Sequence, residues 1–256
     1  MQSGKLRKKK IVAGPLVREV VYAPPTKWDT PQSRKEREAA STAAREATND
    51  RTAKRKLEML FAANFDHHDA FLTLTYREES LPASRSGVQK DVRFFLRRLR
   101  NWAAKKRGRP LKYAYVIEHK HGAGRWHSHF VVNVPSECRA QVFALWPYGE
   151  AGQQDMKPLK REGGHVNYAR LAEYMTKESD GLPVGARMWT ASKNLKKPVV
   201  TYSWVNARPL RLPKGAVLVC ECKQVSAFGY YAYMEYYRPE RDTHHTGGAA
   251  KRKTTE

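Results

Sequence analysis

Cysteine is scarce in this chain of 256 residues, which contains only Cys138, Cys220 and Cys222. Three cysteines do not form a paired disulfide framework, and Cys220 and Cys222 lack two further ligands at the spacing of a zinc site. Long apolar runs are absent too: no stretch reaches about 18 apolar residues, and no apolar segment follows the basic N-terminus. We therefore expect no membrane span, no secretory signal and a reducing, cytoplasmic location.

Acidic residues are also few, with 25 Asp and Glu against 48 Lys and Arg, which leaves a net charge of +23. Such an excess opposes a compact fold unless a polyanion offsets it, so the charge predicts a nucleic-acid partner rather than a membrane. The segment from Arg97 to Lys112 has eight basic residues and no acid. It is either a solvated helix face or a set of phosphate contacts. The candidate DNA-binding residues are Arg97, Arg98, Arg100, Lys105, Lys106, Arg107 and Arg109.

Composition shifts along the chain suggest five parts. The ends mix basic residues with prolines or polar residues, and the segment before the central part is rich in Ala, Glu, Lys and Arg but poor in large apolar side chains. The expected organisation is a basic flexible tail over residues 1–32, a helical extension lying beside the domain over 33–68, a folded domain over 69–205, a C-terminal β hairpin over 206–238 and a basic disordered tail over 239–256.

The central part alternates strand and helix patterns. The stretch AFLTLTY has the period of a half-buried strand, and the residues after it place apolar side chains at helical spacing. Two strand-like runs around a glycine-containing turn predict an antiparallel hairpin. A short helix, another strand and a last helix follow. The predicted fold class is therefore α+β, a central antiparallel sheet with helices packed on one side. The elements are expected at Ala70–Tyr76, Val88–Trp102, Lys112–His119, Trp126–Val134, 136–146 and 166–175.

The hairpin carries a candidate metal site. Side chains on a strand repeat every two residues, so His127 and His129 project from the same face, whereas on a helix they would point about 200° apart. Neutral imidazoles are good ligands for divalent metals, and Mg²⁺ or Mn²⁺ would favour an oxygen as third ligand. Glu118, near the end of the partner strand, is the natural candidate.

Two alternatives to this metal site remain open. The histidines could be structural residues of a strand. A second pair, His119 and His121, lies in the polar, glycine-flanked turn, and His119 could replace Glu118 as the third ligand.

A candidate nucleophile lies on the last helix. Tyr174 and Lys177 are three residues apart, which makes the phenol and the ammonium neighbours on one helix face. A phenolate can attack a phosphodiester and form a covalent phosphotyrosine, and a nearby cation stabilises the charge that this requires. The alternative is a packing tyrosine beside a solvated lysine. Tyr168 lies six residues earlier, about 600° around the helix, so we expect a single nucleophilic tyrosine.

In their order along the chain, FLTLTY, WHSHF and YMTK resemble the three motifs of the HUH endonuclease superfamily, specifically the rolling-circle replication initiators (Rep proteins) of phages and plasmids. The resemblance spans about residues 69–205 and includes Leu145–Gly149 and Ala191–Pro198. Ser128 stands where the family usually has a large apolar residue. Because its side chain points away from the histidines, this departure affects packing more than metal binding.

The resemblance implies a ferredoxin-like (RRM-like) βαββαβ fold and a metal-dependent endonuclease and strand transferase. His127, His129 and Glu118 would bind Mg²⁺ or Mn²⁺, and Tyr174, with Lys177 stabilising charge, would form a 5′-phosphotyrosine on single-stranded origin or hairpin DNA. No phosphate loop of the G-x-x-x-x-G-K-S/T type is present, so a host helicase is the expected partner. A relaxase or single-tyrosine transposase would use the same chemistry, and a non-catalytic nucleic-acid-binding module is the alternative from a different class.

Overall fold

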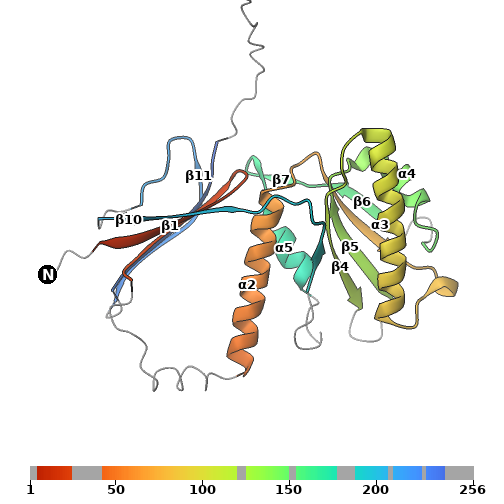
Figure 1. Cartoon of the computed structure of the whole chain (residues 1–256), viewed down its shortest axis with the longest axis horizontal. Coiled ribbons are helices and arrows are strands. Elements are labelled where there is room, and N and C mark those ends of the chain that lie inside the picture. The colour runs from red at the N-terminus through yellow and green to blue at the C-terminus, as the bar shows by residue number, and fades with distance from the viewer. Residues whose placement is uncertain are drawn as a thin grey trace, which may run out of the picture.

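The computed structural model describes residues 5–24, 42–119, 125–149, 154–177, 188–206, 210–226 and 229–239. These residues form two five-stranded antiparallel sheets, a two-stranded ribbon and four α-helices (Figure 1). The elements are β1 Leu6–Ala13, β2 Leu16–Tyr22, α2 Thr42–Ala62, β3 Ala70–Thr75, α3 Arg85–Arg107, β4 Tyr113–His119, β5 Trp126–Val132, α4 Arg139–Ala144, β6 Asp155–Pro158, β7 Arg161–Glu162, β8 His165–Val166, α5 Tyr168–Thr176, β9 Thr190–Ala191, β10 Val199–Val205, β11 Val217–Ser226 and β12 Gly229–Tyr237.

The central sheet has the order β6-β3-β5-β4-β9. Its four longer strands follow the chain as β3, α3, β4, β5, α4 and β6, and their spatial order is fourth, first, third, second. This is the split βαβ arrangement of the ferredoxin-like fold. The predicted α+β class and the predicted order of strands and helices are confirmed.

One face of the central sheet packs on α3 and α4. The helix α3 starts where the Ser84 hydroxyl accepts a hydrogen bond from Gly87 N at 3.4 Å, and it ends at Gly108 with a left-handed φ of 60°. Its apolar stripe is buried against every second residue of β3 and β5, which is the packing that the two periodicities predict. The buried residues include Val88, Val92, Phe95, Leu96 and Leu99 of α3 and Leu72, Leu74, Phe130 and Val132 of the sheet.

The opposite face of the central sheet packs on α5 and α2, which lie between the two sheets (Figure 1). The expectation of helices on one side therefore holds for α3 and α4 only. The cause is that β4 and β5 are apolar on this face as well, at Ala114, Val116 and Val131. Leu57 and Phe61 of α2 are fully buried here, so the expectation that this helix lies beside the domain is wrong for its last turns.

The second sheet has the order β10-β1-β2-β12-β11, which joins strands from the two ends of the described chain. The expectation of a flexible tail over residues 1–32 is wrong for residues 6–22, which form the β1–β2 hairpin. Its lysines do not mark a tail, because Lys8 and Lys10 form ion pairs with Glu19 of β2 at 2.6 and 2.9 Å. Residues 1–4, 25–41 and 240–256 of the predicted extensions lie outside the described residues.

Gly14 sets the turn of this hairpin against the end of α2. Its φ is 55°, and an added Cβ would lie 2.0 Å from the carbonyl oxygen of Ala62. Only glycine therefore allows the hairpin to approach the helix this closely.

The C-terminal strands complete the second sheet. β11 and β12 form the hairpin expected over residues 206–238, and β12 also pairs with β2. β10 pairs with β1 rather than with the central sheet, although it lies inside the predicted domain of residues 69–205. The predicted division into parts missed this sheet because its pairing partners are almost 200 residues apart, beyond the reach of local patterns.

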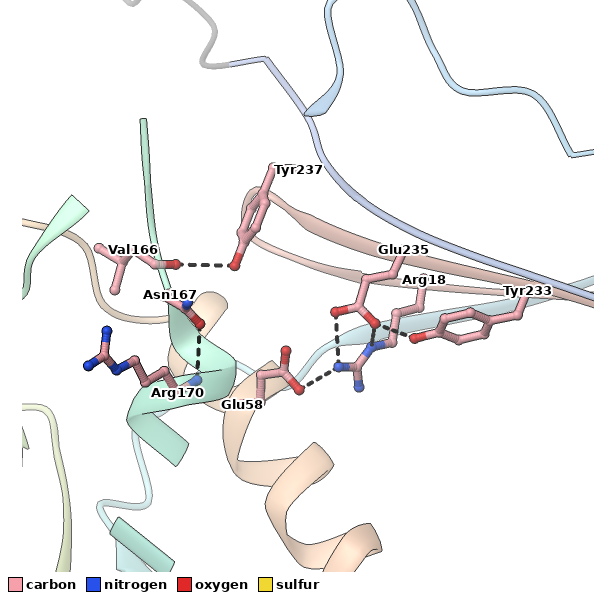
Figure 2. A network of polar contacts seen from close by, with 8 residues as sticks. All are labelled: Arg18, Glu58, Val166, Asn167, Arg170, Tyr233, Glu235 and Tyr237. Carbon is pink, nitrogen blue, oxygen red and sulfur yellow. Dashed lines mark hydrogen bonds and ion pairs between the residues drawn. The ribbon is translucent and has the colours of Figure 1, made fainter. Parts of the chain in front are cut away.

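A buried ionic network joins the second sheet to α2 (Figure 2). Arg18 of β2 donates from Nε to Glu235 of β12 at 2.8 Å and from Nη2 to Glu58 of α2. All three side chains are buried. The hydroxyl of Tyr237 adds a bond to the carbonyl oxygen of Val166 at 3.1 Å, which ties β12 to the chain just before α5. Within the described ranges, no helix has the length and apolar content needed to cross a membrane.

Candidate active site

His129 is the centre of the candidate site. It lies on β5, opposite Thr73 of β3 and Val116 of β4 in the strand registers. Its Nε2 lies 2.7 Å from Oε2 of Glu118, and its Nδ1 lies 3.1 Å from the hydroxyl oxygen of Thr73. Both ring nitrogens are therefore held, and the residue is 5 % exposed. A second hydrogen bond of this kind fixes the orientation of a metal-binding imidazole.

Glu118 and His127 complete the predicted ligand set. They are direct partners in the β4–β5 register, so their side chains leave the same face of the sheet as His129. His119 pairs with Trp126 and stacks on its ring at 4.0 Å between centroids, on the opposite face. The geometry therefore brings Glu118, and not His119, to the two histidines. His121 lies outside the described residues.

The donor set fits a divalent metal after a small rearrangement. Two ligands at right angles on Mg²⁺ or Mn²⁺, each at about 2.1 Å, would be about 3.0 Å apart, close to the 2.7 Å between His129 and Glu118. The rings of His127 and His129 are parallel, with centroids 6.3 Å apart. His127 would therefore have to turn toward the other two ligands. Two imidazoles and a carboxylate suit Mn²⁺ in particular.

Tyr174 and Lys177 lie over this face of the sheet. α5 is capped by Asn167, whose Oδ1 accepts from Arg170 N at 3.0 Å (Figure 2), and its buried side packs Ala172 and Met175 on the sheet. The ring of Tyr174 meets that of His129 edge to face at 5.5 Å between centroids. The side chain is nevertheless 43 % exposed, so the phenol is open to a ligand.

Lys177 connects the tyrosine to the candidate metal ligands. Its Nζ lies 4.3 Å from the centroid of the Tyr174 ring and 4.0 Å from Oε1 of Glu118. The structure thus brings together four predicted residues from β4, β5 and the C-terminal end of α5: Glu118, His129, Tyr174 and Lys177.

Tyr168 has a structural role, as its position on the helix predicts. It is 2 % exposed, and its hydroxyl donates to the carbonyl oxygen of Phe65 at 2.7 Å. Burial raises the pKa of this phenol, which opposes formation of a phenolate. The two tyrosines of α5 therefore differ in access to solvent and in contacts.

The predicted DNA-binding residues lie on the far side of the central sheet from Tyr174, because α3 packs on the opposite face. Arg98 and Arg107 are partly engaged in the fold, where they donate to the carbonyl oxygens of Leu145 and Asn133. The remaining members are exposed and stay predictions as phosphate contacts: Arg97, Arg100, Lys105, Lys106 and Arg109.

Sequence reasoning missed two residues beside the site. Thr73 orients His129, and the alternating strand pattern around it is the signal that could have placed it on that face. Lys157 of β6 pairs with Phe71 in the sheet, and Phe71 contacts the Tyr174 ring at 5.5 Å. The pKa of Lys157 is raised by its hydrogen bond to Asp155 and, to a smaller extent, by Tyr174. A second ammonium therefore lies near the phenol.

A further group outside the predicted site could hold a metal ion. Asp66, His67 and His68, in the turn before β3, have ligand atoms within 4.8 Å of one another. Asp66 and His67 also line a cavity of about 400 Å³ that Lys112 and Lys196 border. Because these ammonium groups oppose the binding of a cation, the acid-containing group around His129 is the better candidate for catalysis.

Comparison with known proteins agrees with the site. Residues 69–179 match a family model described as Replication-associated protein ORF2. Over this segment, the chain is of the rolling-circle Rep type. The Rep-type segment runs from the residue before β3 to just beyond α5, so it contains all of the candidate metal ligands, Tyr174 and Lys177. It ends before Ala191–Pro198, and the second sheet lies outside it. No curated protein and no solved structure matches the chain.

Proposed function

We propose that this replication-associated protein initiates rolling-circle replication of a phage or plasmid by nicking and rejoining single-stranded origin DNA through a 5′-phosphotyrosine. The observation that carries the proposal is the position of Tyr174. Its exposed phenol contacts the His129 ring, and an ammonium group lies 4.3 Å from its own ring centroid. A tyrosine that only packed on the sheet would need neither the exposure nor the cation.

The nicking step moves one phosphodiester bond. The phenol of Tyr174 loses its proton to solvent, and its oxygen attacks the phosphorus. The bond from phosphorus to the 3′ oxygen breaks, and the leaving oxygen takes up a proton to become a free 3′-hydroxyl. The bond count is unchanged, so the reverse attack by a 3′-hydroxyl rejoins the strand and releases the tyrosine without an external energy source.

The surrounding residues would assist this exchange. Lys177 stabilises the phenolate before attack and the extra charge on the phosphoryl oxygens during it. His127, His129 and Glu118 would hold Mg²⁺ or Mn²⁺, which when bound polarises a phosphate oxygen and helps to position the scissile bond. Thr73 keeps the unprotonated nitrogen of His129 directed toward Glu118.

The protein would need a single strand as substrate, because duplex DNA does not present its backbone freely to a site between a sheet and a helix. Origin DNA that is unwound or extruded as a hairpin meets this need. A host helicase would then supply the strand separation. A relaxase or a single-tyrosine transposase would share the chemistry and differ in the DNA on which it acts.

The direct test is formation of a covalent adduct. The full chain is incubated with single-stranded DNA from its own replicon and with Mn²⁺, and a denaturant-resistant protein–DNA species is measured by gel electrophoresis. We expect an adduct with the parent protein, loss of about 10³-fold or more in Tyr174→Phe, and suppression by a chelator. Tight binding of the origin with no adduct would contradict nicking and favour a non-catalytic binding protein.

Tyr168→Phe is the matched control, since it removes a phenol from the same helix. It deletes the bond to Phe65 O, so we expect a loss of about 1 kcal/mol in the free energy of unfolding and an unchanged yield of adduct below the melting temperature. Equal loss of adduct in the two variants would mean that helix stability, and not the nucleophile, explains the effect of Tyr174→Phe.

A further inference from the structure

The second sheet carries an exposed aromatic pair on its edge strand. Tyr202 and Trp204 of β10 are 53 % and 58 % exposed, although such large rings are usually buried. They are two residues apart on one strand, so they leave the same face with a spacing of about 6.7 Å. This spacing leaves each ring free to contact a separate planar ligand.

Two cations lie beside these rings. Arg7 and Lys9 of β1 are the direct partners of Trp204 and Tyr202 in the strand register. The guanidinium carbon of Arg7 is 5.0 Å from the ring centroid of Tyr202 and 5.7 Å from that of Trp204, and Nζ of Lys9 is 5.8 Å from the Tyr202 ring. The aromatic pair therefore lies within a positive field.

The two faces of β1 differ in how their charge is used. Lys8 and Lys10 point to the other face, where Glu19 neutralises them. Within the part of the chain that the structure describes, Arg7 and Lys9 have no acidic partner, and the acid that shares their face, Glu235, is bound to Arg18. The cations beside Tyr202 and Trp204 are thus available for an anion.

The same face continues across the sheet with further rings. Val20 and Tyr22 of β2 follow Lys9 and Arg7 in register, and Tyr233 and Tyr231 of β12 follow these in turn. Tyr231 is 39 % exposed. We use the name aromatic–basic face for the surface formed by Arg7, Lys9, Tyr22, Tyr202, Trp204 and Tyr231.

We propose that the aromatic–basic face binds single-stranded DNA, with Tyr202 and Trp204 stacking on bases and Arg7 and Lys9 contacting phosphates. Stacking on exposed rings combined with backbone contacts to cations is how proteins hold single strands without reading their sequence. A partner protein or a lipid surface would not use the spacing of flat rings between cations in this way. The choice of DNA over RNA rests on the proposed function.

The location of the face gives it a separate task from the nicking site. It lies on the second sheet, outside the Rep-type segment, and the second sheet meets the central sheet through α2 and α5. The face would hold the strand that flanks the nick, while the Tyr174 site acts on the scissile phosphate. Keeping the free end close would favour rejoining over loss of the strand.

The test measures binding of a fluorescein-labelled (dT)12 oligonucleotide by anisotropy, with the full chain carrying Tyr174→Phe and with EDTA present. No adduct can form under these conditions, so the result does not depend on whether the chain nicks DNA. The Tyr202→Ala/Trp204→Ala variant should bind at least about tenfold more weakly, because each lost stack is worth a large factor in affinity. Tyr202→Phe/Trp204→Phe, which keeps both positions aromatic, should bind within about threefold of the parent.

Charge is tested with a second matched pair. Arg7→Gln/Lys9→Gln should weaken binding and reduce its salt dependence, whereas Arg211→Gln/Lys214→Gln, which removes two exposed cations just before β11, should have a much smaller effect. Circular dichroism and melting temperature confirm that each variant is folded.

Three outcomes would overturn the proposal. They are binding of (dT)12 by the alanine variant at the parent's affinity, an equal loss in the phenylalanine variant, and a variant that loses only self-association, anionic-vesicle binding or oligo(U) binding. Failure of nicking alone, with (dT)12 results as expected, would refute the proposed enzyme and leave the aromatic–basic face in place.

Discussion

Thr73 holds the imidazole of His129 from the side away from Glu118. Its hydroxyl lies 3.1 Å from Nδ1, and the carboxylate lies 2.7 Å from Nε2. Three adjacent strands therefore each contribute one member of this chain of contacts. A change at the outer member should reach the metal ligand without altering the ligand itself.

We expect Thr73→Val to raise the Mn²⁺ concentration needed for half-maximal adduct formation by about 10–100-fold, because the isosteric side chain removes only the hydrogen bond. Excess Mn²⁺ should restore the yield. Thr73→Ser, which keeps the hydroxyl, should behave like the parent protein. If Thr73→Val needs no more Mn²⁺ than the parent, the threonine does not position a metal ligand.

Ser128 is the residue where this strand departs from the apolar pattern. It is fully buried on the α3 side, and its hydroxyl has no hydrogen-bond partner among the described residues. Burying such a group costs free energy that an apolar side chain does not lose.

Ser128→Ala should therefore increase the free energy of unfolding by about 1 kcal/mol, measured by urea denaturation. Adduct formation should be unchanged, since the side chain points away from the histidines on either side. A destabilised variant would mean that the hydroxyl has a partner, such as an ordered water.

At the scale of elements, α2 is the connection between the two sheets. Its buried end meets the second sheet through Glu58, which pairs with Arg18 beside Glu235. The pKa of Glu58 is raised chiefly by burial, while Arg18 opposes that rise. The arginine is thus the one cation in this described network that keeps two buried carboxylates compatible with the ionised state.

Arg18→Met should lower the free energy of unfolding at neutral pH by about 3–5 kcal/mol, because it leaves Glu58 and Glu235 buried without their cation. Without Arg18 the folded state favours protonated carboxyls, so it binds more protons than the unfolded state, and the variant should recover stability as pH falls toward about 5. Denaturation at about pH 5 and about pH 7.5 measures the difference. The triple change Arg18→Met/Glu58→Leu/Glu235→Leu is the control, and it should lose most of this pH dependence.

At the scale of the whole molecule, basic groups lie on both sides of the central sheet, because α3 and Tyr174 occupy opposite faces. A strand bound at the nicking site would have to pass around an edge of the sheet to reach α3. With a net charge of +23, several such paths contribute to non-specific binding.

The triple variant Arg100→Gln/Lys105→Gln/Lys106→Gln tests the path over α3. If these exposed residues contact phosphates, the slope of log affinity for single-stranded DNA against log salt should become less steep by about 2 units. Adduct formation at low salt should persist, because no group near Tyr174 changes. An unchanged slope would show that α3 is only a solvated face.

The central sheet and its site were largely predictable because their signals are local. A period of two places His127 and His129 on one face, and the hairpin register sets Glu118 beside them. The contact between Tyr174 and His129 was not predictable from spacing, since it depends on how α5 packs on the sheet. The β1–β2 hairpin was missed because Glu19, which neutralises its lysines, and the strands that flank it are visible as partners only in three dimensions.

The order of strands in the second sheet also dictates an order of events during synthesis. β1 and β2 leave the ribosome first, but the strands that flank them, β10 and β12, follow almost 200 residues later. At about 5–20 residues per second, the hairpin waits roughly 10–40 s for β12, while the Rep-type segment already has all of its central strands except β9. The nicking site can therefore fold before the aromatic–basic face exists, and a ribosome that stops early would release a chain with the first and without the second.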